Sequence, residues 1–137
     1  MEKPIGLTKQ RGFQVGARKT FPIPLEQAWE FLLSPEGGKF WLGEPEESKA
    51  LEIGKTLISK EGIEAKISIY KPRSHLRMTW KHKAWKNTSI LQIRVIPAGT
   101  KTTISFHQEK LSNEGQRALM KAHWKQVLAQ ITAYLEI

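Results

Sequence analysis

The sequence contains no cysteine, which excludes disulfide bonds, cysteine-ligated zinc, thiol redox chemistry and iron–sulfur clusters. It also contains no apolar run close to the roughly 20 residues that a membrane-spanning helix needs. Residues 1–20 carry basic side chains but no apolar segment, so we expect no secretory signal. The expected location is therefore a reducing cytoplasm.

Motifs of common catalytic, nucleotide-binding and metal-binding sites are absent as well. The sequence has no GxSxG, P-loop or GxGxxG pattern. Its histidines show no HExxH spacing; they are His75, His82, His107 and His123. We interpret scattered histidines of this kind as structural or surface residues. The sequence therefore predicts no metal, no cofactor and no catalytic residue.

The composition is that of an ordinary globular domain. Of the 137 residues, 39% are hydrophobic and 26% are charged, which allows one self-standing core. Residues 1–11 are polar and include one proline and one glycine, so we expect a flexible N-terminal arm. Residues 12–137 are expected to form a single domain.

Hydrophobic periodicity predicts a strand, two short helices and then a sheet. Alternation of apolar and polar residues indicates a strand over 12–20. Helical spacing follows from Leu25 to Leu33, and the segment 34–38 ends that helix. A short apolar block, 40–42, precedes a polar stretch. From residue 57 on, about five alternating segments separated by turn residues are typical of an antiparallel meander.

The C-terminal segment predicts a long helix. Asn113 and Gln116 have the spacing of a capping box. An apolar stripe at helical spacing follows, formed by Met120, Trp124, Val127, Leu128, Ile131 and Leu135. A helix over 113–136 would be roughly 36 Å long and would lie across the apolar face of the sheet. The predicted fold class is therefore α+β, with a hollow between sheet and helix that favours a ligand cavity.

Positive charge is the unusual feature of the composition. The formal net charge is +9, and residues 71–110 alone carry nine basic side chains against one acidic side chain, Glu109. Such an excess favours nucleic acid, an acidic membrane or an acidic protein as partner. We interpret it instead as a solvated sheet face on which Arg77 and Arg94 lie together, because no nucleic-acid reader motif is present. Glu109 is interpreted as a surface charge, and Trp85 as an exposed ring at a basic hairpin tip.

Several ordered motifs resemble one protein family. They are RKTFPIPLEQAW at 18–29, FW at 40–41 after SPE at 34–36, TKTTISFHQEKL at 100–111 and MKAHWKQVL at 120–128. Together they are similar to the helix-grip (START-like, SRPBCC) superfamily, and within it to the family named for the activator of the 90-kDa heat-shock protein ATPase. The resemblance implies a curved antiparallel sheet of about six strands wrapped around a long C-terminal helix, with two short helices after the first strand.

The resemblance also implies a function: binding of a hydrophobic or amphipathic small molecule between sheet and C-terminal helix. The expected cavity wall consists of Trp41, Ile67, Met78, Trp80, Leu91, Ile93, Ile104, Phe106, Trp124, Val127, Leu128 and Ile131, with Gln108 as a polar anchor. Core packing alone is the other interpretation of the tryptophans. Two alternative functions stay open. One is a chaperone- or protein-binding adaptor that uses Arg77, Arg94 and Lys101, and the other is an enzyme on polyketide-like or lipid-like substrates.

Overall fold

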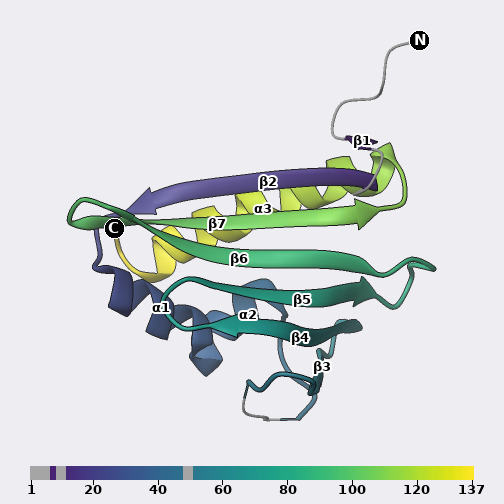
Figure 1. Ribbon diagram of the computed structural model, residues 1–137, viewed down its shortest axis with the longest axis horizontal. Helices are drawn as coiled ribbons and strands as arrows, with labels where there is room; N and C mark the ends of the chain where they lie inside the picture. The colour runs from purple at the N-terminus through teal and green to yellow at the C-terminus, as the bar shows by residue number, and fades with distance from the viewer. Residues whose placement is uncertain (1–6, 9–11, 48–50) are drawn as a thin grey trace.

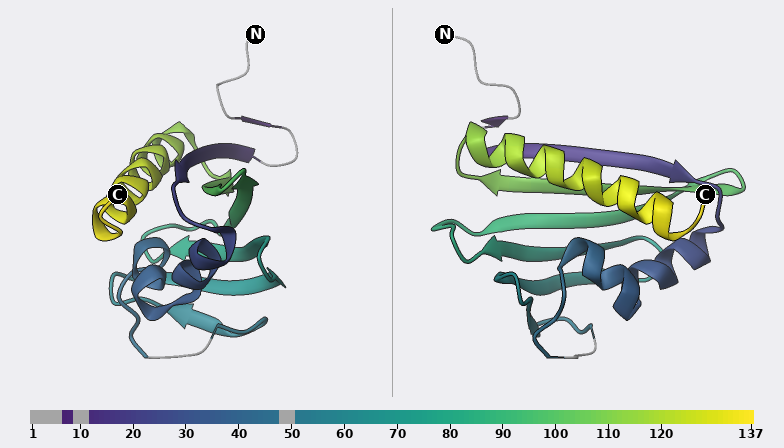
Figure 2. Two further views of the ribbon diagram at one scale, coloured as in Figure 1. Left: turned by 90° about the vertical axis from the view of Figure 1, so that its left-hand side faces the viewer. Right: turned by 180° about the vertical axis from the view of Figure 1, so that it is seen from behind.

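The described part of the chain forms one seven-stranded antiparallel sheet with three helices on one of its faces (Figures 1 and 2). The computed structural model describes residues 7–8, 12–47 and 51–137. The strand order is β1-β2-β7-β6-β5-β4-β3. The strands are β1 (Leu7–Thr8), β2 (Gly12–Phe21), β3 (Thr56–Ile58), β4 (Ile63–Lys71), β5 (His75–His82), β6 (Ser89–Ala98) and β7 (Lys101–Leu111). The helices are α1 (Leu25–Leu33), α2 (Pro35–Trp41) and α3 (Glu114–Tyr134).

The sequence expectations for the helices are confirmed. The side chain of Ser34 accepts a hydrogen bond from the Gly37 amide at 3.0 Å, so the residue that ends α1 also caps α2. At the start of α3, the Asn113 side chain accepts from the Gln116 amide at 2.8 Å. In turn, the Gln116 side-chain oxygen accepts a hydrogen bond from the Ser112 amide at 3.0 Å. This pair forms a capping box in which the second donor is the amide before the N-cap residue rather than that of the N-cap residue itself.

The core lies between the sheet and α3. Alternate residues of β4 to β7 are buried, as an antiparallel sheet with one covered face requires. The α3 stripe is buried against them through Met120, Trp124, Val127, Leu128 and Ile131. Figure 2 shows α3 running along β2 and β7, with α1 and α2 covering the remainder of the same face. No helix of the described residues lies on the opposite face of the sheet (Figure 2, left).

The predicted sheet of about six strands is confirmed, with the two-residue β1 as an added edge. Leu7 and Thr8 pair with Phe13 and Gly12, whereas the other residues of the expected N-terminal arm lie outside the described residues. No helix among the described residues combines the length and apolar character needed to cross a bilayer.

Candidate functional site

The residues expected to form the cavity wall are packed against one another. All twelve and the predicted polar anchor, Gln108, are buried, and the most exposed of them, Leu128, has 4% of its surface accessible. The rings of Phe106 and Trp124 stack with centroids 4.7 Å apart and an interplanar angle of 9°. The region between sheet and α3 is therefore filled by the protein's own aromatic rings. Entry of a ligand there stays a prediction.

The predicted polar anchor, Gln108, already has protein partners at both its side-chain oxygen and its amide nitrogen. Its side-chain oxygen accepts from the Trp124 indole at 2.8 Å, and its amide nitrogen donates to the Ser89 hydroxyl at 2.9 Å. The Ser89 hydroxyl in turn donates to the backbone carbonyl of Trp80. A ligand that used Gln108 would have to replace these buried bonds, each of which costs about 1–3 kcal/mol to leave unmade.

A pocket of 490 Å³ lies beside this core, between the α1–α2 corner and the edge of the sheet. It opens among residues of α1, α2, β3, β4 and the segments 42–47 and 51–55. Its apolar walls are Leu33, Pro35, Trp41, Leu42, Pro45, Leu51, Leu57 and Ile58, and Tyr70 from β4 adds an aromatic ring. Of the twelve predicted wall residues, Trp41 lines this pocket, and Trp80 lines a smaller one of 280 Å³ near the start of α3.

Hydrogen bonds hold the inner wall of the 490 Å³ pocket in place. The Trp41 indole donates to the backbone carbonyl of Leu32 at 2.9 Å, and the Trp80 indole donates to the Trp41 carbonyl at 3.0 Å. The outer wall is joined to β3, since the amide of Glu46 donates to the Ile58 carbonyl at 2.9 Å. These bonds preorganise the walls, which lowers the entropic cost of binding.

Sequence reasoning missed most of this pocket. The stretch after Trp41 was interpreted only as polar, although it contributes Leu42, Pro45 and Leu51 to the walls. The one usable signal was the apolar block 40–42. It lies at the C-terminal end of α2 and includes Trp41 and Leu42, both of which are buried. Periodicity gave no further help, because irregular segments have no regular repeat to detect.

Two interpretations of single residues are wrong. Trp85 is half-buried rather than exposed, because its ring packs on Trp80 with centroids 5.6 Å apart. Glu109 is 5% exposed rather than a free surface charge, because its carboxylate forms an ion pair of 2.7 Å with the Arg77 guanidinium. Both side chains gain partners from β5, which lies beyond β6 as seen from Glu109, and sequence spacing does not reveal these contacts.

Ionisable side chains are few among the described residues that line the 490 Å³ pocket. Among the residues that line it, Glu47 and Tyr70 can ionise, and Glu47 is exposed. Within the described part of the chain, no group of three or more His, Asp or Glu side chains is placed to hold a metal ion.

His123 gives a pH-dependent prediction. Its ring contacts Trp80 and Trp124 at centroid distances of 6.4 and 4.7 Å, and burial lowers the pKa of His123 below its ordinary 6.5. The unfolded chain then binds a proton at higher pH than the folded chain, so the free energy of unfolding falls as the pH drops through about 6.5. We expect His123→Gln to flatten this slope, relative to the wild type, in urea titrations across this pH range. Equal slopes for wild type and His123→Gln would contradict the assignment.

Comparisons place the chain among known folds. The sequence model of a family described as Activator of Hsp90 ATPase homolog 1-like protein matches residues 22–136. No curated protein matches the chain. CalU16 from Micromonospora echinospora is a similar structure, with 17% identity and a TM-score of 0.77 over 88% of this chain and 74% of CalU16.

Two further structures share the fold. DynU16, from the dynemicin biosynthetic locus, has 19% identity and a TM-score of 0.78 over 90% of this chain, which spans about half (47%) of DynU16. PFC0360w, an HSP90 activator from Plasmodium falciparum, has 15% identity and a TM-score of 0.74 over 90% of this chain and 96% of that protein. At such identities the likeness shows the fold alone.

Proposed function

The chain belongs to the Activator of Hsp90 ATPase homolog 1-like family, within the helix-grip (START-like, SRPBCC) superfamily, and we propose that it binds a hydrophobic or amphipathic small molecule. The proposed site is the pocket between the α1–α2 corner and β3–β4, rather than the packed core beneath α3. Binding is non-covalent. We also propose a cytoplasmic location, in keeping with the cysteine-free sequence.

The apolar pocket is the observation that supports this function. Its 490 Å³ falls within the range of about 300–1,000 Å³ that is common for small-molecule sites. Burial of an apolar ligand would contribute about 25 cal/mol for each Å² of apolar area removed from water, less the cost of association. Polar side chains at the pocket include Ser34 and Tyr70. Because the Ser34 hydroxyl already donates to the Phe31 carbonyl and accepts from the Gly37 amide, the Tyr70 phenol is the group proposed to orient the polar end of an amphipathic ligand.

Gly38→Trp is the variant that tests the pocket. Gly38 lines it, and a Cβ added at Gly38 would meet no atom within 4 Å, so we expect an indole at this position to extend into the ligand space. Native mass spectrometry of gently purified wild-type protein is expected to show a stoichiometric bound mass of a few hundred daltons. Gly38→Trp should lose that mass, and should also lose saturable binding of the fluorescent probe anilinonaphthalene sulfonate.

Two control variants separate pocket filling from other effects. Gly38→Ala changes the same position without filling the pocket and should keep binding. Lys39→Trp adds the same indole to the next position of α2, where the side chain is exposed, and should also keep binding. A wild-type protein that carries no small molecule and binds the probe no better than Gly38→Trp would refute the proposal.

A second candidate function is an adaptor that binds an acidic protein partner through the outer sheet face. Arg77 and Arg94 do line one groove on that face, which favours it, whereas Lys101 lies at the β6–β7 turn and does not line the groove. The combined charge reversal of Arg77, Arg94 and Lys101 should then abolish capture of a purified chaperone. An enzyme on polyketide-like or lipid-like substrates remains the third alternative, for which Tyr70 and Glu47 are the ionisable groups at the pocket.

A further inference from the structure

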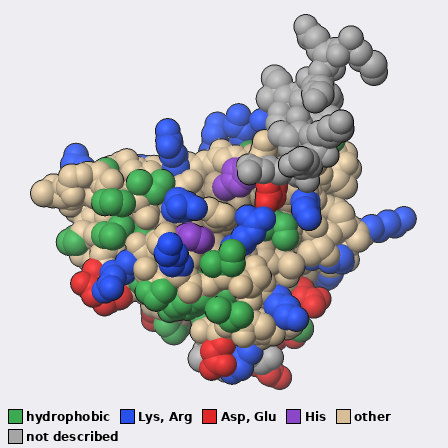
Figure 3. Space-filling view, in the orientation of Figure 1, with side chains coloured by type: hydrophobic (Ala, Val, Ile, Leu, Met, Phe, Trp, Pro, Cys, Tyr) green, Lys and Arg blue, Asp and Glu red, His purple; other side chains and the backbone are tan. Residues whose placement is uncertain are grey.

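The outer face of the sheet carries a row of basic side chains in register. Paired residues on neighbouring antiparallel strands have their Cβ atoms about 4.5–5.5 Å apart. From β4 to β2, the pairs of this row are Lys71 with His75, His75 with Arg94, Arg94 with Ser105 and Ser105 with Arg18. Figure 3 shows Lys, Arg and His side chains gathered on this face. Five strands thus contribute to one basic surface.

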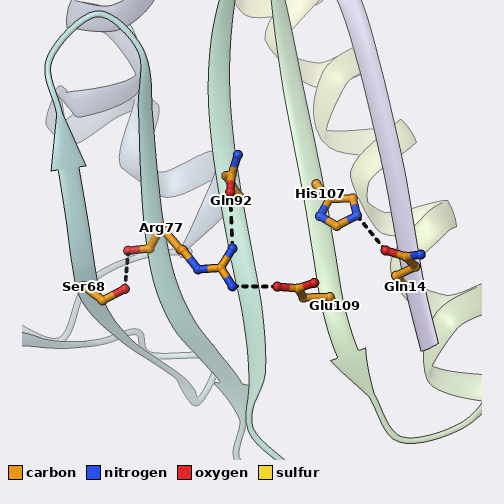
Figure 4. A network of polar contacts seen from close by, with 6 residues as sticks. All are labelled: Gln14, Ser68, Arg77, Gln92, His107 and Glu109. Carbon is orange, nitrogen blue, oxygen red and sulfur yellow. Dashed lines mark hydrogen bonds and ion pairs between the residues drawn. The ribbon is translucent and has the colours of Figure 1, made fainter. Parts of the chain in front are cut away.

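A second row of paired residues lies beside the first, and its cation, Arg77, is fixed by hydrogen bonds. Arg77 pairs with Gln92 across β5 and β6, and Gln92 pairs with His107 across β6 and β7. The Arg77 guanidinium donates to the Gln92 side chain at 3.3 Å and to Glu109 at 2.7 Å, so it reaches across β6 (Figure 4). Because the Glu109 carboxylate is almost fully buried, this guanidinium is held in one orientation.

A groove of 640 Å³ lies between these rows. It is lined by Arg77, Gln92, Arg94, Ser105, His107, Glu109 and Lys110. Lys110 reaches the groove from a β-bulge: it has a φ of 62°, and the pairing of β2 with β7 shifts register at this point. Bulges of this kind re-aim side chains and are frequent beside binding sites.

The charge in the groove is positive. Three of its lining residues carry a permanent positive charge, namely Arg77, Arg94 and Lys110, and one carries a carboxylate that Arg77 engages. His75, in the adjacent row, is affected by the same positive charges. Its pKa is lowered by burial and further by the nearby charges of Arg94, Lys71 and Arg77. An anion in the groove would relieve this repulsion.

We propose that the groove is a second binding site, distinct from the apolar pocket, for the oxyanion of a small organic acid or phosphate ester. The Arg94 guanidinium and the Lys110 ammonium supply the charge, and the planar guanidinium suits bidentate contact with carboxylate or phosphate oxygens. The Ser105 hydroxyl lies opposite Arg94 and donates a neutral hydrogen bond. Arg77, oriented by Glu109, closes the groove from the β5 side.

The test compares phenyl phosphate, benzoate and uncharged benzamide as probes, by two-dimensional NMR of the full chain in about 0.15 M NaCl. We expect saturable shifts at Arg94 and Ser105 with one or both anions and none with benzamide. Tighter binding of phenyl phosphate would identify the ligand class as phosphate esters, and tighter binding of benzoate would identify it as carboxylic acids. With sulfate, which does not titrate in this range, the pKa of His75 should rise. Chemical shifts that do not saturate with either anion, or shifts of equal size with benzamide, would overturn the proposal.

Lys101 provides the matched control. Arg94→Gln and Lys101→Gln each remove one cation from the same sheet face, but only Arg94 lines the groove. We expect Arg94→Gln to weaken anion binding about tenfold and Lys101→Gln to change it by less than about twofold. If both variants weakened anion binding equally, the effect would be one of general charge, and the proposed site would be refuted. Binding of an acidic peptide that depends on Lys101, without binding of either small anion, would also overturn it and would assign the face to a protein partner.

Discussion

Trp124→Ala is expected to lower the free energy of unfolding by about 3–5 kcal/mol, since truncation of a buried tryptophan leaves a large cavity. Trp124 has no exposed surface and stacks on Phe106 with centroids 4.7 Å apart. Its indole also donates the bond that satisfies the buried Gln108 oxygen. Urea titration monitored by circular dichroism measures the change. A loss under about 1 kcal/mol would show that Trp124 is not packed as described.

Two further variants, Trp124→Phe and Gln108→Leu, separate the contributions of packing and hydrogen bonding to the free energy of unfolding. Trp124→Phe keeps an aromatic ring but leaves the Gln108 oxygen without its donor, which we expect to cost about 1–3 kcal/mol beyond the lost packing. Gln108→Leu alone would in turn strand the Trp124 N–H. The double variant should therefore cost less than the two single variants added together. Additive losses would argue that the two side chains do not share a hydrogen bond in solution.

The position of Trp124 could be predicted from the sequence, because regular periodicity carries the information. The spacing from Met120 to Ile131 fixed the buried face of α3, and the Asn113–Gln116 spacing fixed its start. Alternation did the same for the inward residues of the sheet. A stripe that matches an apolar sheet face predicts contact between the two, but it does not predict whether a space is left between them. Here the tryptophans and Phe106 fill that space.

The pocket and the groove depend on contacts that no local pattern encodes. The pocket wall forms where the irregular segment after Trp41 is joined to β3 by a backbone hydrogen bond from the Glu46 amide to the Ile58 carbonyl. The groove depends on register across several strands, which placed Arg77 beside Glu109, 32 residues away. The sequence predicted that Arg77 and Arg94 share a face, because both alternate with buried residues. It did not predict the buried partner that orients Arg77.

Gly37→Ala is expected to destabilise the fold by about 3 kcal/mol and to lower the melting temperature by roughly 10 °C. A Cβ at Gly37 would lie 1.8 Å from the carbonyl oxygen of Phe31 and 3.0 Å from the Cα of Leu32. These atoms belong to the α1 backbone, so relief of the clash requires α1 and α2 to separate. The same carbonyl accepts bonds from the Ser34 amide and hydroxyl at 3.1 and 2.6 Å, which separation would strain.

Gly38→Ala is expected to have the opposite effect, although the two glycines are adjacent and equivalent in the sequence. A Cβ at Gly38 meets nothing within 4 Å, and alanine in a helix interior is favoured over glycine by about 0.5–1 kcal/mol. Thermal unfolding of both variants is the measurement. Similar destabilisation by the two substitutions would contradict the close approach of α1 and α2 at Gly37. Because that approach places Gly38 at the pocket and Trp41 against the core, the pair of variants also tests whether the pocket is built as described.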